Sequence, residues 1–371
     1  MCGDTSICLT GFQTFISFPN NVQRGDGYLT QEFWLVGFDC YCWIETGWLV
    51  SASQSSPVLF WAQQSGDGTE FATLATARYV GVVDAADGNS GRFYVVRQAD
   101  RSFDVRIDTA EVAHRATTRN PMWDDREYGY VNMGMELVAS SGSATGFTFF
   151  TGNRYWTAPR ATAYVGAWAA ADDSDDPPYG EWLLPPDEPA DEGGVYFTQC
   201  CLPLYGAEAA GPNTDGAKVQ NVDAAATEDA GRPEPPPPPD ESLFDRPDTS
   251  LEGVPALDTG STGQVLGFDP EALAAWMATA SLGVPYEGEV TTSPKTVCPV
   301  TAAEADELLP EPTGLEPDRL LCVATAEGSF TISAPTRLGD PQPESLTADQ
   351  AYVVVDAATG NLLVAGAFRR G

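Results

Sequence analysis

The sequence predicts a mainly β protein with an N-terminal antiparallel β-sandwich or jelly-roll-like domain, a Pro-rich linker and a small C-terminal α+β domain. Three observations lead to this prediction. Short runs of aromatic and β-branched residues recur through residues 10–170, clusters of Gly, Asn, Asp and Ser separate these runs, and helix signals are confined to the last third of the chain. We expect residues 1–205 to form the sandwich domain, 206–262 the acidic linker and 263–371 the α+β domain.

The N-terminal domain is expected to consist of short strands. One hairpin stands out, because Phe103, Val105 and Ile107 alternate with charged residues in the second of two strand-like runs, 93–97 and 103–108. The other expected strands are Phe12–Phe18, Phe33–Phe38, Tyr41–Val50, Val58–Ala62, Phe71–Val83, Met133–Ala139, Gly146–Thr151 and Ala163–Ala169.

The linker is low in apolar residues and contains the run Pro235–Pro239, which favours a stiff polyproline II spacer over a folded core. The domain after it carries two helix start signals: Asp269-Pro270-Glu271, and the capping box from Thr301 to Glu304. Two strands at 320–325 and 329–333 are expected next, followed by a hairpin with arms 352–356 and 361–364 and a turn at 357–360.

The charge of the chain is strongly negative and unevenly distributed. The 371 residues include 53 acidic and 19 basic side chains, a net charge of −34. Residues 1–170 hold 17 acidic and 11 basic side chains, and the remainder holds 36 and 8. This balance argues strongly against a nucleic-acid partner, and the absence of a run of about 18 apolar residues argues against membrane insertion.

Only two basic residues are lysines, Lys218 and Lys295. A large carboxylate excess with so little lysine is typical of proteins dissolved in concentrated salt, where screening removes the repulsion between carboxylates. A GC-rich genome combined with one acidic linker is the alternative explanation. No basic and apolar leader follows Met1, so no secretory signal is predicted.

The eight cysteines occur as Cys2/Cys8, Cys40/Cys42, Cys200/Cys201 and Cys298/Cys322. Cys298 and Cys322 flank a helical segment and are candidates for a disulfide. For the first six, buried free thiols are the alternative to disulfides. Cys2, Cys8, Cys40 and Cys42 also form a candidate metal site.

The candidate chemical sites are few. The single histidine, His114, is expected in a surface loop, because no G-x-S-x-G elbow supplies a serine partner for it. No catalytic residue and no cofactor is predicted. Oxygen-rich clusters suit a divalent cation such as calcium at Asp84 and Asp87, and at Asp172, Asp173 and Asp175.

Five aromatic residues lie among amides and carboxylates, the combination that stacks on and hydrogen-bonds to sugars. We expect them to form a subunit interface, with packing inside the sandwich and glycan contact as the alternatives. They are Trp123, Tyr128, Tyr130, Tyr155 and Trp156.

In composition and layout the chain resembles accessory structural proteins of haloarchaeal tailed viruses, such as vertex, decoration, baseplate or fibre subunits. That resemblance implies a non-enzymatic virion protein in a high-salt environment, which contacts other copies of itself, other virion proteins and a host surface glycan or protein. The alternatives are a cell-surface or secreted glycan-binding protein of a halophile and a carboxylate-dependent hydrolase, which would need a pocket with one carboxyl of raised pKa.

Overall fold

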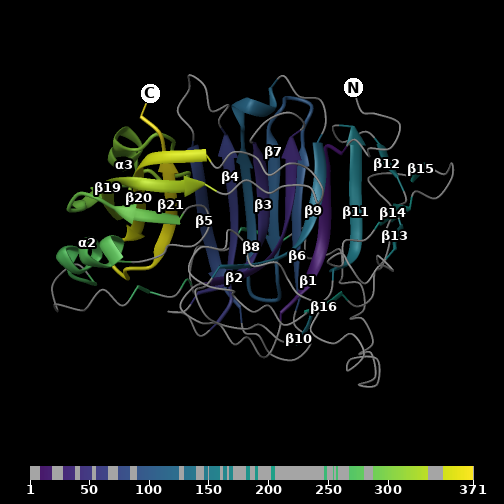
Figure 1. Cartoon of the computed structure of the whole chain (residues 1–371), viewed down its shortest axis with the longest axis horizontal. Coiled ribbons are helices and arrows are strands. Elements are labelled where there is room, and N and C mark those ends of the chain that lie inside the picture. Colours follow the sequence, from purple (N-terminus) through teal and green to yellow (C-terminus); the bar gives the residue numbers. More distant parts are fainter. Residues whose placement is uncertain are drawn as a thin grey trace. The chain divides into compact units, whose positions relative to one another are not determined.

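The computed structural model describes part of the chain, and it divides into two compact units (Figure 1). The first unit comprises residues 1–38, 45–59 and 83–250, and the second comprises 39–44, 60–82 and 251–371. The second unit therefore combines the expected C-terminal domain with segments that the sequence analysis assigned to the N-terminal domain. The described residues are 9–18, 28–37, 42–51, 56–65, 74–83, 90–124, 129–138, 146–148, 150–158, 162–164, 167–169, 181–183, 189–190, 202–204, 246–248, 254, 256–257, 267–279, 287–332 and 346–370.

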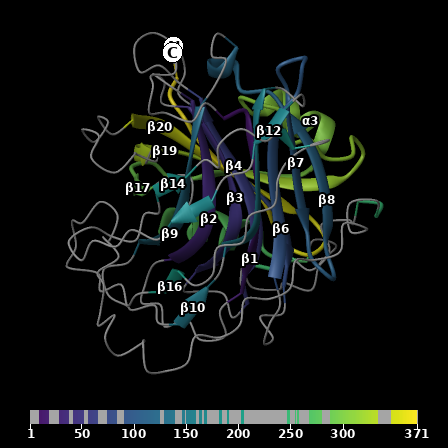
Figure 2. The same cartoon turned by 90° about the vertical axis from the view of Figure 1, so that its right-hand side faces the viewer.

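The first unit contains a seven-stranded sheet in the order β15-β12-β11-β1-β6-β7-β8. Figure 2 shows β6, β7 and β8 side by side. Its strands are β1 (Gly11–Ser17), β6 (Ser90–Arg97), β7 (Phe103–Asp108), β8 (Ala113–Thr118), β11 (Phe150–Ala158), β12 (Thr162–Tyr164) and β15 (Pro189–Ala190). The expected 93–97/103–108 hairpin is the β6–β7 pair.

The first unit also contains a second layer of strands, in which β2 lies between β3 and β9. The two layers meet at Phe12 in β1 and Phe33 in β2, whose rings pack edge to face with centroids 5.0 Å apart. Both side chains are fully buried, so they mark the interior of a sandwich. The remaining elements are β2 (Tyr28–Gly37), β3 (Trp43–Ser51), β9 (Gly129–Val138), the pairs β10 (Gly146–Thr148) with β16 (Leu202–Leu204) and β13 (Ala167–Ala169) with β14 (Glu181–Leu183), and a 3₁₀ turn at Pro121–Trp123.

The second unit is built on a sheet in the order β17-β19-β20-β21-β5-β4, with β18 also paired to β19. Its C-terminal strand β21 pairs with β5, so residues near both ends of the sequence share one sheet. The strands are β4 (Val58–Ser65), β5 (Leu74–Val82), β17 (Glu287–Val290), β18 (Lys295–Thr301), β19 (Leu320–Ile332), β20 (Leu346–Asp356) and β21 (Leu362–Phe368).

Two helices pack on the second unit's sheet. Helix α2 (Pro270–Thr279) begins after Asp269, whose carboxylate accepts a hydrogen bond from the Glu271 amide at 2.9 Å. Helix α3 (Ala302–Leu308) begins with the predicted capping box between Thr301 and Glu304. Its buried Ala302 and Ala305 pack on residues of β19, β20 and β21.

The prediction of a mainly β fold is confirmed, since the described elements are strands apart from two helices and one 3₁₀ turn. The pairings of β1 with β6 and β11, β2 with β9, β19 with β20, β20 with β21, and β7 with β6 and β8 are antiparallel. The two strands expected at 320–325 and 329–333 are one strand, β19, in which the register shifts between Glu327 and Phe330. No helix among the described residues has the length and hydropathy needed to cross a bilayer.

Candidate functional site

One face of the second unit's sheet carries a polar cluster, here named the Glu311 cluster. It consists of Gln63 in β4, Thr76 and Arg78 in β5, Tyr352 in β20 and Glu311 in the loop after α3. The strand register explains part of this gathering. Tyr352 pairs with Gly366 in β21, and Gly366 pairs with Thr76, so these positions form one row across three strands.

Gly366 makes room for the Tyr352 side chain. A Cβ atom at this glycine would lie 2.3 Å from the tyrosine Cζ, so the ring crosses β21 directly over it. The hydroxyl then reaches Thr76 Oγ1 at 3.2 Å on the next strand. Both Tyr352 and Thr76 are fully buried, which requires their hydroxyl groups to find partners.

The Glu311 carboxylate accepts hydrogen bonds from three directions. Arg78 Nη2 donates to its Oε1 at 2.8 Å, and Gln63 Nε2 donates to its Oε2 at 3.3 Å. The Tyr352 hydroxyl is a weaker donor to Oε1, at 3.5 Å. The Arg78–Glu311 pair is largely shielded, with 14% and 12% of the two side chains exposed, so its charges interact in a medium less polar than water.

Arg78 also fits between the carboxylate and an aromatic ring. Its Cζ lies 4.5 Å from the centre of the Trp61 ring, a cation–π distance, and its Nη2 donates to the Pro312 carbonyl at 3.4 Å. The guanidinium therefore holds both the side chain of Glu311 and the backbone that follows it.

Burial raises the pKa of Tyr352, and the nearby Glu311 charge raises it further, so the phenol remains a neutral donor at physiological pH. The loop carrying Glu311 has a second attachment, because Asp306 Oδ1 accepts bonds from both the amide and the hydroxyl of Thr313 at 2.7 Å. The role open to this arrangement is a structural one. The Glu311 carboxylate attaches the loop after α3 to the sheet, and the Asp306 carboxylate attaches it to the helix.

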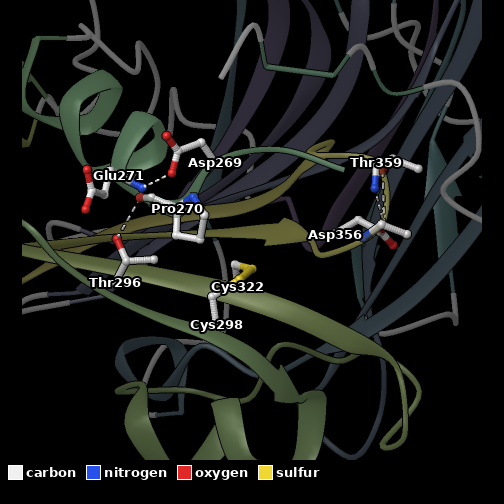
Figure 3. The surroundings of a disulfide bond; sticks show 9 residues. Asp269, Pro270, Glu271, Thr296, Cys298, Cys322, Asp356 and Thr359 are labelled. Atoms are coloured by element: carbon white, nitrogen blue, oxygen red, sulfur yellow. Dashed lines mark hydrogen bonds between the residues drawn. A yellow bond between two sulfur atoms is a disulfide. The ribbon is translucent and has the colours of Figure 1, made fainter. Parts of the chain in front are cut away.

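The opposite face of the same sheet carries the disulfide between Cys298 in β18 and Cys322 in β19 (Figure 3). Neighbouring Thr296 donates from its hydroxyl to the Pro270 carbonyl at 3.4 Å, which attaches the first turn of α2 to β18. The disulfide considered from the sequence is thus present, and it links two strands on either side of α3 along the chain.

Asp356, at the end of β20, organises the last hairpin (Figure 3). Its Oδ1 accepts bonds from the amides of Ala358 and Thr359, both at 3.0 Å, and its Oδ2 accepts Nη2 of Arg319 at 2.7 Å. Burial opposes ionisation of this carboxyl, but the bonds from Arg319 and the turn amides outweigh it and lower the pKa of Asp356.

The first unit has its own buried charge cluster, around Asp108 at the end of β7. Arg115 Nη1 lies 2.7 Å from its Oδ1 and Arg92 Nη2 lies 3.6 Å from its Oδ2. Burial raises the pKa of Asp108, and hydrogen bonding and charge from Arg115 partly offset this rise. The side chains of Asp108 and Arg92 are 0% and 1% exposed. The carboxyl with the raised pKa is therefore buried beside two arginines.

Two further carboxylates, Glu32 in β2 and Glu45 in β3, are buried in the first unit. Thr30 Oγ1 donates to Glu32 Oε1, and the backbone of Gly47 in β3 lies against the Cβ of Glu32. Position 47 therefore has no room for a side chain beside Glu32.

The aromatic candidates are only partly described. Trp123 is fully buried, with its ring edge to face on Phe103 at 5.2 Å, and Trp156 is 5% exposed and packs on Tyr94 at 5.2 Å. The interface and glycan interpretations are therefore wrong for these two residues, which belong to packed clusters of the chain itself. The side chains of Tyr128, Tyr130 and Tyr155 lie outside the described residues.

His114 does not lie in a surface loop, as we expected, but in strand β8. Its side chain is 15% exposed, and its Nδ1 lies 3.8 Å from a carboxylate oxygen of Asp248. The candidate cation ligands Asp84, Asp87, Asp172, Asp173 and Asp175 lie outside the described residues. Within the described part of the chain, no group of three or more His, Cys, Asp or Glu side chains is arranged to hold a metal ion.

The expectation of free thiols is wrong for Cys42, which is disulfide-bonded. Its sulfur is therefore not available to the four-cysteine metal site considered above. The other three candidate ligands of that site, Cys2, Cys8 and Cys40, lie outside the described residues. Among the described residues no cysteine is free.

No sequence pattern indicates the Glu311 cluster. Thr76 and Tyr352 are separated by 276 positions, and Arg78 and Glu311 by 233, so no motif joins them. The one local hint is a tyrosine inside the otherwise apolar run at 351–355.

Comparison with known proteins shows little similarity. No family model matches the chain, and no curated protein matches it. A crystal structure of scytalido-glutamic peptidase with a peptide-based transition-state analogue overlaps 41% of this chain and 76% of its own, with 11% identity and a TM-score of 0.29. A second structure of scytalido-glutamic peptidase, with a transition-state analogue inhibitor, gives 10% identity and a TM-score of 0.28 over 41% of this chain and 77% of its own. Overlaps at these TM-scores assign neither a fold family nor an activity.

Proposed function

We propose that this chain is a non-enzymatic structural subunit of an extracellular particle, namely a vertex, decoration, baseplate or fibre component of a virus that infects a halophilic host. The observation that carries this proposal is the way the described polar and sulfur groups are used. The Glu311 cluster, the Asp356 turn and the Cys298–Cys322 disulfide each tie together segments that are distant in sequence. Such ties suit a subunit that must keep its shape outside a cell.

The disulfides support the extracellular location. Cys42, Cys298 and Cys322 are the cysteines among the described residues, and all three are bonded. Disulfides of this kind persist in oxidising surroundings, including virion surfaces, and are rare in the reducing cytosol. A particle component released when its host lyses would meet those surroundings without needing a secretory signal.

The composition supports the high-salt environment. At a net charge of −34 the chain repels itself strongly in dilute buffer. At about 1 M salt the Debye length falls to about 3 Å, so this repulsion is screened and copies can approach one another. Assembly is therefore expected to need salt.

A candidate contact surface lies in the second unit. The large apolar side chains that are exposed among the described residues are Val297 in β18, Leu308 in α3 and Leu320 in β19, at 46%, 53% and 54%. All three fall within the segment from β18 to the start of β19. We take them as the test positions for contacts with other copies or other virion proteins.

The test is the oligomeric state of the full chain in molar and in dilute salt, by sedimentation velocity and negative-stain microscopy. We expect a closed symmetric oligomer in molar salt that dissociates in dilute salt. Replacing Leu308 and Leu320 by Gln should shift the equilibrium toward monomer, whereas the matched Glu307→Gln change on exposed α3 should not. A monomer under both conditions overturns the proposal, and sugar binding by that monomer would favour the glycan-binding alternative.

A further inference from the structure

Strand β8 forms one edge of the seven-stranded sheet among the described residues, with β7 as its neighbour (Figure 2). Its burial decreases along the strand, from buried Ala113 to exposed Thr117. An edge strand presents backbone N–H and C=O groups that can pair with a strand of another molecule, and proteins commonly cover or interrupt such edges.

The turn between β7 and β8 is shaped to present carbonyl oxygens. Thr109 Oγ1 accepts the amides of Glu111 at 3.1 Å and Val112 at 2.9 Å, and the Thr109 amide donates to the Val112 carbonyl at 2.8 Å. These bonds use the turn's amides internally. The carbonyls of Thr109 and Ala110 face a common donor, which the Val112 carbonyl also accepts with its second lone pair.

That donor is Arg246, which lies 134 to 137 positions further along the chain. Its Nη1 donates to the Ala110 carbonyl at 2.9 Å, and its Nη2 donates to the carbonyls of Val112, at 2.9 Å, and of Thr109. A planar guanidinium with several fixed donors suits three converging acceptors, which a lysine ammonium on its flexible stem would fit less well.

Two residues on, Asp248 contacts the edge strand itself. Its carboxylate accepts a hydrogen bond from the backbone amide of Arg115 and lies 3.8 Å from Nδ1 of His114. Pro247, between the two contacts, has no N–H with which to extend a ladder outward. The segment therefore uses edge groups of β8 without presenting a complete edge of its own.

We propose that residues 246–248, here named the strap, close the β8 edge: the 109–112 turn is a binding site for the arginine of an Arg-Pro-Asp segment, and its occupancy in cis prevents a second copy from pairing with β8. The occupant is the chain's own strap, which is seated there. Residues 246–248 lie within the segment 206–262, which we interpreted from the sequence as a linker. The strap attaches this part of the segment to the first unit.

The test is an Arg246→Ala/Asp248→Ala variant of the full chain, with Arg370→Ala as control. Arg370 is 67% exposed in the second unit, so its replacement removes a charge without touching β8. We expect hydrogen exchange at residues 109–118 to accelerate by more than about tenfold in the strap variant, because bonds to charged groups are lost. In dilute salt, where the wild-type chain is expected to be monomeric, we also expect the strap variant to form a concentration-dependent dimer by sedimentation velocity.

Unchanged exchange at 109–118 overturns the proposal. Faster exchange without a dimer overturns the edge-blocking role. A peptide of residues 244–250, added in excess, should restore slow exchange and the monomer, whereas the same peptide with Arg246→Ala should do neither. If the double variant does not fold, Arg246→Lys provides the test, since it keeps the charge while losing the three-carbonyl geometry.

Discussion

The ring of Tyr352 lies directly over Gly366 on the neighbouring strand, close enough that a methyl group at position 366 would sit 2.3 Å from the tyrosine Cζ and 2.5 Å from its hydroxyl oxygen. This contact decides how the polar face of the second unit is built. Because the glycine leaves the surface of β21 open, the tyrosine can cross it and reach Thr76 and Glu311. The absence of a side chain at Gly366 thus lets the Tyr352 hydroxyl join the Glu311 cluster.

We therefore expect Gly366→Ala to destabilise the protein by about 1–3 kcal/mol, the usual cost of overfilling a packed site. The measurement is the free energy of unfolding in urea. The same substitution in a Tyr352→Ala background should cost much less, because the ring that it collides with is gone. Equal costs in the two backgrounds would show that Tyr352 and Gly366 are not coupled.

The local parts of this unit could be predicted from the sequence. The capping box at Thr301 and the cap at Asp269 depend on residues a few positions apart, and both helices begin there. The last hairpin followed from its apolar arms and the turn that ends at Gly360, where φ is 74°. Short-range hydrogen bonding and backbone freedom are properties that sequence patterns report directly.

The long-range pairing could not be predicted in the same way. The uniformly apolar run of β21 fits a partner on either side, and nothing local selects β5 as the strand opposite Ala365 and Ala367. The Glu311 cluster depends on that choice, because Thr76 and Arg78 reach Tyr352 and Glu311 only when β5 lies beside β21. Its members therefore looked like unrelated polar residues in the sequence.

Trp123 shows a different limit. Its polar neighbours suggested an exposed ring, but side-chain direction depends on the backbone of the turn. Asn120 caps that turn by accepting the Met122 amide at 3.2 Å, and Trp123 then lies inward against Phe103. Polarity of adjacent residues does not report which way a side chain points in a short 3₁₀ turn.

A second prediction concerns the buried pair Arg92 and Asp108. Asp108→Asn removes the carboxylate that lies between Arg92, which is 1% exposed, and Arg115. Because burial raises the pKa of Asp108 and so offsets part of this loss, we expect a decrease of about 1–3 kcal/mol in unfolding free energy. Replacing both residues together, by Met and Leu, should cost less than Asp108→Asn alone, because neither charge is then buried.

The matched comparison is the surface pair Arg119 and Asp124, at 2.8 Å with 59% and 29% of the side chains exposed. Asp124→Asn should cost less than about 1 kcal/mol, because water and salt screen that pair. Similar losses for Asp108→Asn and Asp124→Asn would mean that burial does not set the strength of these ion pairs.

A third prediction concerns the Cys298–Cys322 disulfide, whose cysteines are 24 positions apart. Replacing both by Ser should lower the free energy of unfolding by about 3–4 kcal/mol on the chain-entropy model. Reduction of the wild-type protein should lower it as well, through this disulfide and any other that is reduced. A double variant as stable as wild type, measured under non-reducing conditions, would show that α3 and its flanking strands hold together without the bond.

The fourth prediction is a pH dependence that arises at Asp356. Its pKa is lowered below the ordinary value of 3.8, because bonds from Arg319 and the turn amides outweigh the effect of burial. A carboxyl with a lowered pKa stabilises the fold above its unfolded-state pKa, and this contribution disappears as pH falls through the folded-state pKa. Asp356→Asn should therefore reduce the unfolding free energy by about 1–3 kcal/mol at neutral pH, with the difference from wild type shrinking below about pH 4.

The measurement is urea unfolding of both proteins from neutral to acid pH, with a substitution of the exposed α3 residue Glu307, Glu307→Gln, as the control. The comparison separates the effect of Asp356 from that of the many other carboxyls that titrate. A wild-type minus variant difference that stays constant through the acid range would contradict the assignment of the lowered pKa to Asp356.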